Sequence, residues 1–394
     1  MSNEIRWGIL GCSWVASFAL IDPAKEVSTA KILAVASRDV NKGNEYAKKH
    51  NIPRVHNSYE DLLADPEIDA VYVPLPNALH KKWTIASLRA GKHVLCEKPI
   101  ASNKQEVEEM VAVARETGLM LAEGYHNLYH PFLHRFKEEV DRLSDIKDVE
   151  VEFGIKIMKS SDIRFQWELS GGATMDGSYA LNMLRYIVEP RYDIKCTRAI
   201  AETDPKHHHP QIDMTMTSWF DLLPAKVSEK EEDSESVSRE KSVEIRSVEN
   251  YGHAKTKASL TKWIPKMSVR VVATDGSVLE ATNFVMPQYY HSMKVVDGPS
   301  GETRAKERSW LGEKPSTYVL QLRAICECFA KKDYGFLPWK GPEDSIRTMD
   351  LVDSVYESSG LLRRGQKSDD DSKKDGKDEK GEKEDEEYKD GKEQ

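Results

Sequence analysis

The stretch "IRWGILGCSWVA", residues 5–16, decides the fold of this chain. Its first half is mostly apolar and has the length of a buried strand, and its second half places small residues at Gly11, Ser13 and Ala16. A tight turn from a strand into a helix requires small residues at such positions, because the backbone approaches its surroundings closely there. We therefore expect a strand, a turn and a helix in immediate succession, with the helix N-terminus at the turn.

The alternation of strand and helix patterns continues to about residue 125. Apolar segments such as "KILAVAS" (31–37), "AVYVPL" (70–75) and "HVLCEKP" (93–99) are separated by segments of helical length. Strands separated by such helices indicate right-handed βαβ units and a parallel sheet. Residues 1–125 are therefore predicted to form a doubly wound α/β domain of the Rossmann type.

The pattern changes after this domain to alternation with period two. "VEVEFGIKI" (149–157), "TMTSWFDLL" (215–223) and "MSVRVVAT" (267–274) alternate as half-buried antiparallel strands do. With 394 residues the chain is long enough for a second domain. We expect residues 126–365 to form an α+β domain with an open, largely antiparallel sheet.

Two segments are too polar to join either core. Residues 226–244 are charged and rich in serine, and residues 366–394 hold 13 acidic and eight basic residues without any aliphatic one. Such segments cannot bury enough apolar surface to fold. The first is predicted to be an extended hairpin or a disordered insertion, and the second a disordered acidic tail.

Composition excludes several classes of function. The net charge is −9 and no cluster of Lys and Arg suits a phosphate backbone, so we expect no nucleic-acid partner. No apolar run approaches the roughly 20 residues that span a bilayer, and the N-terminal residues do not follow a signal-peptide pattern. Five scattered cysteines without CxxC spacing indicate reduced thiols and no metal site. We expect a cytoplasmic protein, in which His207, His208 and His209 form a solvated loop.

The end of the second predicted strand indicates which dinucleotide binds. NAD enzymes commonly carry an acidic residue there for the ribose 2′-hydroxyl, whereas a 2′-phosphate requires a small hydroxyl and a guanidinium. Ser37 and Arg38 fit the phosphate pattern and favour NADP, with NAD as the alternative. Asp39 follows directly, and it either caps the next helix or faces the ribose.

These motifs together resemble one family. "GILGCSWVA" (8–16), "ASRD" (36–39), "VPLPNALH" (73–80) and "AGKHVLCEKPIA" (90–101) are similar in order and spacing to the Gfo/Idh/MocA oxidoreductases. The likeness extends through "ELSGGATMDGSYALNMLRYIV" and covers about residues 4–363. Its branch resembles that of glucose–fructose oxidoreductase, dimeric dihydrodiol dehydrogenase and NADP-linked aldose dehydrogenases.

The resemblance implies an NADP-dependent dehydrogenase or reductase of a sugar, polyol or vicinal diol. It also implies a homodimer or larger homo-oligomer formed through the open face of the second sheet. If that face is rich in exposed apolar side chains, another subunit would be needed to cover it. The alternative is a non-catalytic NADP(H)-sensing regulator of the same fold. Because a sensor needs neither Lys98 nor Tyr179, their presence favours the enzyme.

Site residues follow from the resemblance, position by position. Lys98 and Tyr179 are expected to be catalytic, and the peptide before Pro99 is often cis in the family. Tyr179 takes the proton of a substrate hydroxyl while hydride passes to the nicotinamide, and the Lys98 ammonium stabilises the alkoxide and lowers the pKa of Tyr179. The residues that we expect to contact the cofactor are Gly8, Gly11, Ser13, Trp14, Val15, Ser37, Arg38, Pro76, Asn77, His80, Glu97 and Lys98.

The substrate side is less regular. Asp176 lies three positions before Tyr179 where relatives have four, and on a continuous helix this shift rotates the side chain by about 100°. It is therefore open whether the Asp176 side chain points toward the substrate. Tyr125, His126 and Arg164 are further candidates for the substrate pocket. Two cofactor candidates also have structural alternatives, namely His80 as a polar residue of a surface helix and Glu97 as a turn carboxylate.

Overall fold

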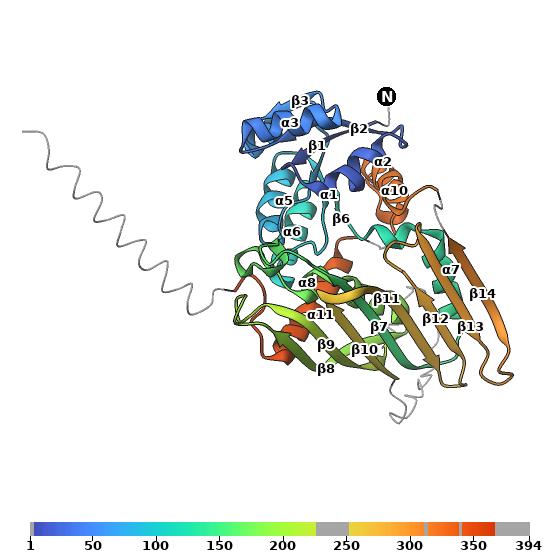
Figure 1. Ribbon diagram of the computed structural model, residues 1–394. Helices are drawn as coiled ribbons and strands as arrows, with labels where there is room; N and C mark the ends of the chain where they lie inside the picture. Colours follow the sequence, from blue (N-terminus) through green and yellow to red (C-terminus); the bar gives the residue numbers. More distant parts are fainter. Residues whose placement is uncertain (1–3, 226–251, 311–313, 339–340, 367–394) are drawn as a thin grey trace, which may run out of the picture.

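The computed structural model describes residues 4–225, 252–310, 314–338 and 341–366, which form two sheets with helices around them (Figure 1). The predicted insertion at 226–244 and the predicted tail, apart from residue 366, lie outside the described residues. No helix in the described part of the chain has both the length and the apolar composition needed to cross a membrane.

The first sheet confirms the predicted Rossmann domain. Its six strands lie in the order β3-β2-β1-β4-β5-β6 and pair in parallel, which is the doubly wound order that brings the strand C-termini to one edge. The sequence analysis did not identify the short β3. The strands are β1 Ile5–Leu10, β2 Ala30–Ala36, β3 Arg54–His56, β4 Ala70–Val73, β5 His93–Cys96 and β6 Leu121–Glu123.

The helices of this domain begin where the sequence supplies caps. The Asp39, Ser58 and Asn103 side chains each accept a hydrogen bond from a main-chain N–H of the first turn of α3, α4 and α6. The first helix contains a π-helical segment between two short α-helical ones. The bounds are α1 Trp14–Ala16, η1 Ser17–Ile21, α2 Asp22–Ala24, α3 Val40–His50, α4 Tyr59–Ala64, η2 Asn77–Leu79, α5 His80–Arg89 and α6 Lys104–Thr117.

The second sheet is largely antiparallel, as predicted. Its eight strands lie in the order β14-β13-β12-β11-β7-β10-β9-β8, and only β7 and β10 pair in parallel within the described strands. The strands are β7 Ile146–Lys156, β8 Tyr192–Thr203, β9 Asp213–Pro224, β10 Gly252–Ser259, β11 Thr261–Ala273, β12 Val278–Thr282, β13 Tyr290–Val296 and β14 Thr303–Trp310.

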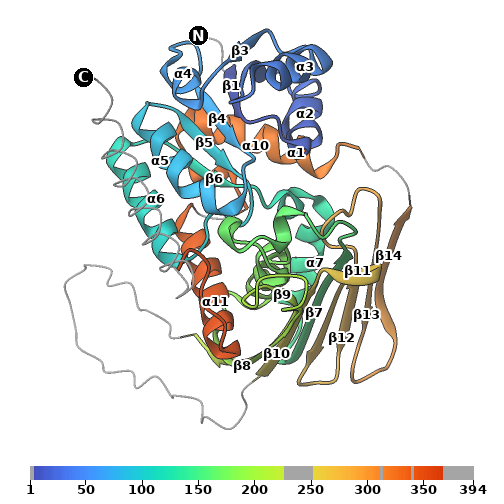
Figure 2. The ribbon, with the colours of Figure 1, turned by 60° about the vertical axis from the view of Figure 1, so that its left-hand side comes forward.

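Helices cover one face of this sheet, and α11 lies between α6 and β8 (Figure 2). The α-helices are α7 Pro131–Asp141, α8 Ala173–Asp176, α9 Tyr179–Val188, α10 Thr317–Lys331 and α11 Glu343–Ser359. Short 3₁₀ turns connect several elements, namely η3 His126–Tyr129, η4 Ile163–Phe165, η5 Trp167–Leu169 and η6 Tyr334–Phe336.

The outer face of the second sheet carries charged side chains, among them Glu150, Lys255, Arg270 and Glu280. Along β7 the buried Val149 alternates with Glu150, as expected for a sheet with one solvated face. Exposed apolar side chains lie among these charges, namely Ile200 of β8, Tyr290 of β13 and Trp310 of β14. The outer face is therefore mixed, and a homo-oligomer formed through it stays a prediction.

Helix α10 differs from its predicted place. The sequence analysis put it in the second domain, yet α10 packs on the first, beside α2 (Figure 1). Its apolar face, with Leu322, Ile325 and Phe329, shares a core with Trp7 and Ile9 of β1. The chain therefore returns to the Rossmann domain at α10, which connects the two domains a second time.

Candidate active site

The turn after β1 has the geometry of a dinucleotide site. Gly11 has φ +87°, and a Cβ there would lie 3.1 Å from the Tyr59 hydroxyl oxygen, so only glycine fits without strain. Gly8 differs from Gly11, because it lies inside β1 and packs against Leu62 and Ile68. Gly8 therefore allows close packing in the core and does not belong to the turn.

The helix after this turn begins at Trp14, with Ser13 at its N-cap. The Ser13 side chain makes no cap hydrogen bond, which leaves the N-terminus available to an anionic group. Val15 is half-buried, and the Trp14 side chain is 78% exposed at the mouth of the turn. These positions fit a pyrophosphate held at a helix N-terminus.

The three consecutive residues after β2, Ser37, Arg38 and Asp39, have different surroundings. Asp39 caps α3, its Oδ1 accepting from Lys42 N at 3.1 Å, so its carboxylate is committed to the helix. Ser37 is buried, whereas Arg38 is exposed and makes no ion pair with any described residue. This arrangement suits a 2′-phosphate.

The loops after β4 and β5 are held together by His80. The ring is fully buried, with Nδ1 2.9 Å from Pro99 O and Nε2 2.7 Å from Leu75 O, and burial lowers the pKa of His80 to about 4. The alternative of a surface residue is therefore wrong. Pro76 precedes η2, and the Asn77 amide donates to Ser170 O of the second domain at 3.1 Å.

Lys98 reaches the second domain from the end of β5. The Lys98–Pro99 peptide is cis. The ammonium donates to Asp176 O at 2.8 Å and to Asp176 Oδ1 at 3.3 Å, and both side chains are mostly buried. Lys98 and Asp176, 78 positions apart in the chain, therefore meet at the junction of the two domains.

Asp176 is aimed at this centre in spite of its shortened spacing. The helix is interrupted at Gly177 and Ser178, between α8 and α9, so the argument from a continuous helix does not hold. A Cβ at Gly177 would lie 2.6 Å from the Ala258 side chain, which shows how tightly the break is packed. The second oxygen of Asp176 lies 3.0 Å from Arg164 Nε.

The two cations set the charge of Asp176. Burial on its own raises the pKa of this carboxyl, but Lys98 and Arg164 outweigh it and hold the pKa below its ordinary value. Arg164 also pairs with Asp162 at 3.0 Å. The network of two cations and two carboxylates has no net charge.

Tyr179, at the start of α9, lies under Lys98. The ammonium is 4.6 Å from the centre of the Tyr179 ring and contacts its face. Burial raises the pKa of Tyr179 well above its ordinary value, and Tyr318 and Glu97 raise it further. The pKa of Tyr179 is therefore not lowered in this arrangement, because burial has the largest influence on it.

Aromatic rings surround Tyr179. Tyr125 and His126 both meet its ring edge to face, with centroids 5.6 and 5.9 Å away. His126 also stacks on Tyr318 at 3.9 Å, and its Nδ1 lies 2.8 Å from Thr317 Oγ1. Burial lowers the pKa of His126 to about 3, so the ring is neutral.

Sequence reasoning missed Thr317 and Tyr318, which come from the start of α10. No local signal connects them with Tyr179, because only the return of α10 to the Rossmann domain brings them there. It also missed Glu123 at the end of β6, whose place at a strand C-terminus was a usable signal. Glu97 accepts from the Tyr72 hydroxyl at 2.6 Å, and burial raises its pKa.

The histidine run does not form a free loop. His208 stacks on Phe165 at 4.5 Å and His209 on Trp167 at 5.1 Å, so two of the three rings are packed. They support the segment that carries Arg164. Within the described ranges, no three His, Cys, Asp or Glu side chains are grouped so as to hold a metal ion.

Comparison with known proteins identifies a family that the first domain matches. Residues 5–125 match the model of the Gfo/Idh/MocA family, described as an oxidoreductase family with an NAD-binding Rossmann fold. Trans-1,2-dihydrobenzene-1,2-diol dehydrogenase of Mus musculus is 35% identical over 190 residues, which are 46% of this chain and 56% of the relative. D-xylose 1-dehydrogenase (NADP(+)) 2 of Haloferax volcanii is 37% identical over 184 residues, again 46% of this chain and 56% of the relative. The match thus spans a little over half of the length of these curated relatives.

Solved structures resemble nearly the whole chain. A 3-ketoreductase from Actinomadura kijaniata, in complex with NADP and TDP-benzene, superposes with a TM-score of 0.72 at 23% identity, covering 90% of this chain and 98% of that one. An aldose-aldose oxidoreductase from Caulobacter crescentus, complexed with glycerol, gives 0.73 at 22% identity, covering 91% and 98%. At these identities the likeness establishes a shared two-domain fold.

Proposed function

We propose that this chain, whose residues 5–125 match the model of the Gfo/Idh/MocA oxidoreductase family, is an NADP-dependent oxidoreductase of a sugar, polyol or vicinal diol. The observation that carries the proposal is the meeting of Lys98, Asp176 and Tyr179 at the C-terminal edge of the Rossmann sheet. In open α/β sheets this edge is where ligands bind.

The residues of the first domain fit NADP. Gly11 and the N-terminus at Ser13 would hold the pyrophosphate, while Ser37 and Arg38 would hold the 2′-phosphate. The bound cofactor supplies or accepts the hydride. The dehydrogenase of Haloferax volcanii carries NADP(+) in its name, and the ketoreductase structure contains NADP.

Lys98 and Tyr179 would handle the substrate oxygen. An ammonium has three N–H donors, and Asp176 takes two of those of Lys98, so one remains for the oxygen that gains charge in the reaction. Because the pKa of Tyr179 is raised, its hydroxyl is held as a proton donor. This state is suited to reduction of a carbonyl, and oxidation requires the same hydroxyl to lose its proton first.

The charges around the centre favour a neutral substrate. The carboxylates of Asp162 and Asp176 balance Lys98 and Arg164, so no unpaired cation of this network remains for a phosphate or carboxylate. Related proteins are named for a diol, for xylose and for a dTDP-linked sugar. Among these, a free sugar or diol fits this network better than a nucleotide-linked one.

Oligomeric state and compartment belong to the same proposal. A homo-oligomer through the outer face of the second sheet would have to match charges such as Glu150 and Lys255 between subunits. All five cysteines are free, which suits the reducing cytoplasm.

The test is nicotinamide reduction and oxidation with NADP and NAD in parallel, over aldopentoses, aldohexoses, polyols, aromatic trans-diols and the matching carbonyl compounds. Turnover with NADP on one class supports the proposal. The Tyr179→Phe variant should lose turnover and retain NADPH binding. Tight NADPH binding without turnover on any compound would instead favour a sensor of the same fold.

A further inference from the structure

A second carboxyl group contacts the segment that carries Lys98. Glu123 ends β6 and pairs in register with Cys96 at the end of β5, from which the Lys98 loop (residues 97–101) departs. Neighbouring parallel strands therefore deliver the carboxyl group directly to this loop. Its Oε1 accepts from the Ile100 N–H at 2.9 Å.

The other oxygen of Glu123 connects the loop with α11. Oε2 accepts from the Ser345 hydroxyl in the first turn of α11 at 2.5 Å. One carboxyl group thus joins the Lys98 loop to a helix more than 200 positions away. It is distinct from Asp176, which contacts the Lys98 side chain.

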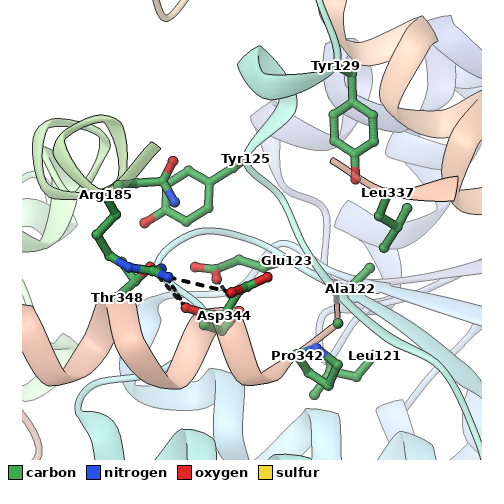
Figure 3. A pocket seen from close by; sticks show the side chains of 13 residues that line it. Leu121, Ala122, Glu123, Tyr125, Tyr129, Arg185, Leu337, Pro342, Asp344 and Thr348 are labelled. Atoms are coloured by element: carbon green, nitrogen blue, oxygen red, sulfur yellow. Dashed lines mark hydrogen bonds and ion pairs between the residues drawn. The ribbon is translucent and has the colours of Figure 1, made fainter. Parts of the chain in front are cut away.

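A small cavity with a mixed lining of apolar and polar side chains lies beside Glu123 (Figure 3). It measures about 30 Å³, and the Asn182 Oδ1 on its wall has no hydrogen-bond partner among the described residues. A cavity of this size with an unsatisfied oxygen has room for water. A water in this cavity would lie beside the Glu123 carboxyl group.

The groups that face Glu123 come from each neighbouring element. Arg185 of α9 favours its charge, Glu97 of the Lys98 loop opposes it, and the carboxylate of Asp344 in α11 lies on the same cavity, paired with Arg185. Burial is the largest influence and raises the pKa of Glu123 to about 7. Its charge state therefore changes around neutral pH.

We propose that Glu123 is a positioning residue, which acts on the Lys98 loop by holding the main chain of Ile100 and joining it to α11. The inference rests on the proposed function, because it matters for turnover only if Lys98 serves the reaction. The ionised carboxylate holds the Ile100 N–H more strongly than the protonated form does, since charge-assisted hydrogen bonds are stronger. The loop is thus held more firmly above pH 7 than below it.

Asp353 offers a matched control. It is also a buried carboxyl, its pKa is raised to about 6 by burial, and it accepts from a main-chain N–H, that of Lys104 at the start of α6. It contacts no residue of the Lys98 loop within the described hydrogen bonds and ion pairs. Asp353→Asn therefore perturbs a buried titrating carboxyl without touching the proposed contact.

The first experiment is amide hydrogen exchange of the full-length protein with bound NADP. Exchange of the Ile100 amide should accelerate at least tenfold in Glu123→Ala and stay near the wild type in Glu123→Gln, whose amide oxygen still accepts. In Asp353→Ala, the counterpart of Glu123→Ala, the Lys104 amide should accelerate and the Ile100 amide should not. Unchanged exchange at Ile100 in Glu123→Ala overturns the proposal. If the alanine variant does not fold, the pH dependence of Ile100 protection decides: protection should rise through about pH 7 in the wild type and not in Glu123→Gln, and the same pH dependence in both overturns the proposal.

The second experiment is the pH profile of kcat. Glu123→Ala should lower kcat about tenfold with the KM for NADP unchanged, and Glu123→Gln should lack the inflection near pH 7 that wild type and Asp353→Asn show. Faster exchange at Ile100 without any change in kcat overturns the positioning role. A wild type without turnover sinks only the proposed function, because exchange still decides whether Glu123 holds the loop.

Discussion

Asp176 and Glu123 are both partly buried carboxyl groups beside the Lys98 loop, and the structure gives them different charges. Burial raises the pKa of each. Asp176 lies between two cations that outweigh burial, so its pKa is low, whereas Glu123 accepts from an amide and a hydroxyl and its pKa rises to about 7. The charge of the partners, and not the degree of burial, decides which carboxyl is permanently ionised.

This difference gives each carboxyl its own task. Asp176 is a fixed anion that holds the Lys98 ammonium over Tyr179. Glu123 holds the main chain of the same loop with a strength that depends on pH. One group therefore orients the reactive amine, and the other supports its backbone.

The largest expected effect comes from removing the cation that defines the Asp176 environment. Lys98→Met should lower turnover by about 10³-fold or more, because the substrate oxygen loses its charged donor. Binding of NADPH, followed by fluorescence titration, should change only a few-fold. Lys81→Met, which breaks an exposed pair with Glu109, is the control and should retain turnover. More than a tenth of wild-type turnover in Lys98→Met would contradict a catalytic role.

Replacing each carboxyl group by an amide should change the free energy of unfolding in opposite directions. At pH 8, Asp176→Asn should lower the free energy of unfolding by roughly 3 kcal/mol, because two mostly buried cations lose their partner. Glu123→Gln should raise it by about 2 kcal/mol, because a neutral amide replaces a charge that burial disfavours. Urea unfolding at one pH measures both. A change of the same sign in the two variants would refute the comparison.

The pH dependence sharpens the same contrast. The pKa of Glu123 is raised in the folded state, so its favourable contribution is complete below the ordinary value near 4.5 and is lost as pH rises through about 7. The advantage of Glu123→Gln should therefore grow from pH 5 to 7 by up to about 1.4 kcal/mol per unit and then level off. The pKa of Asp176 is lowered, so its contribution falls only below pH 3.8. Unfolding of Asp176→Asn should show a constant deficit from pH 5 to 8.

The smallest effect concerns the second cation. Arg164→Gln leaves Lys98 as the remaining partner of Asp176, and kcat/KM should fall only about threefold because the guanidinium side chain is about a third exposed. Arg115→Gln, which removes an exposed pair with Glu343, is the matched control. A loss as large as that of Lys98→Met would show that Arg164 itself contacts the substrate.

Local sequence was sufficient wherever neighbours in the chain determine the structure. The strand and turn at Gly11 and the strand before Lys98, which ends at Cys96, were predicted from patterns a few residues long. Such patterns are reliable because backbone conformation and strand burial depend mainly on adjacent residues. The parallel order of the first sheet followed from the alternation of these elements. The assignment of Ser37 and Arg38 to a 2′-phosphate stays a prediction.

Only the tertiary structure decided how the centre is charged and supported. The break at Gly177 turns Asp176 toward Lys98, the return of α10 places Tyr318 beside His126, and the ends of β5 and β6 bring Glu123 to Ile100. A pKa such as that of Tyr179 depends on every group within a few ångströms, and most of those groups are distant in the chain. The sequence by itself therefore indicated Lys98, Asp176 and Tyr179 as candidates. The packing of distant elements brought Thr317, Tyr318 and Glu123 to the same region and decided which of these groups carry charge.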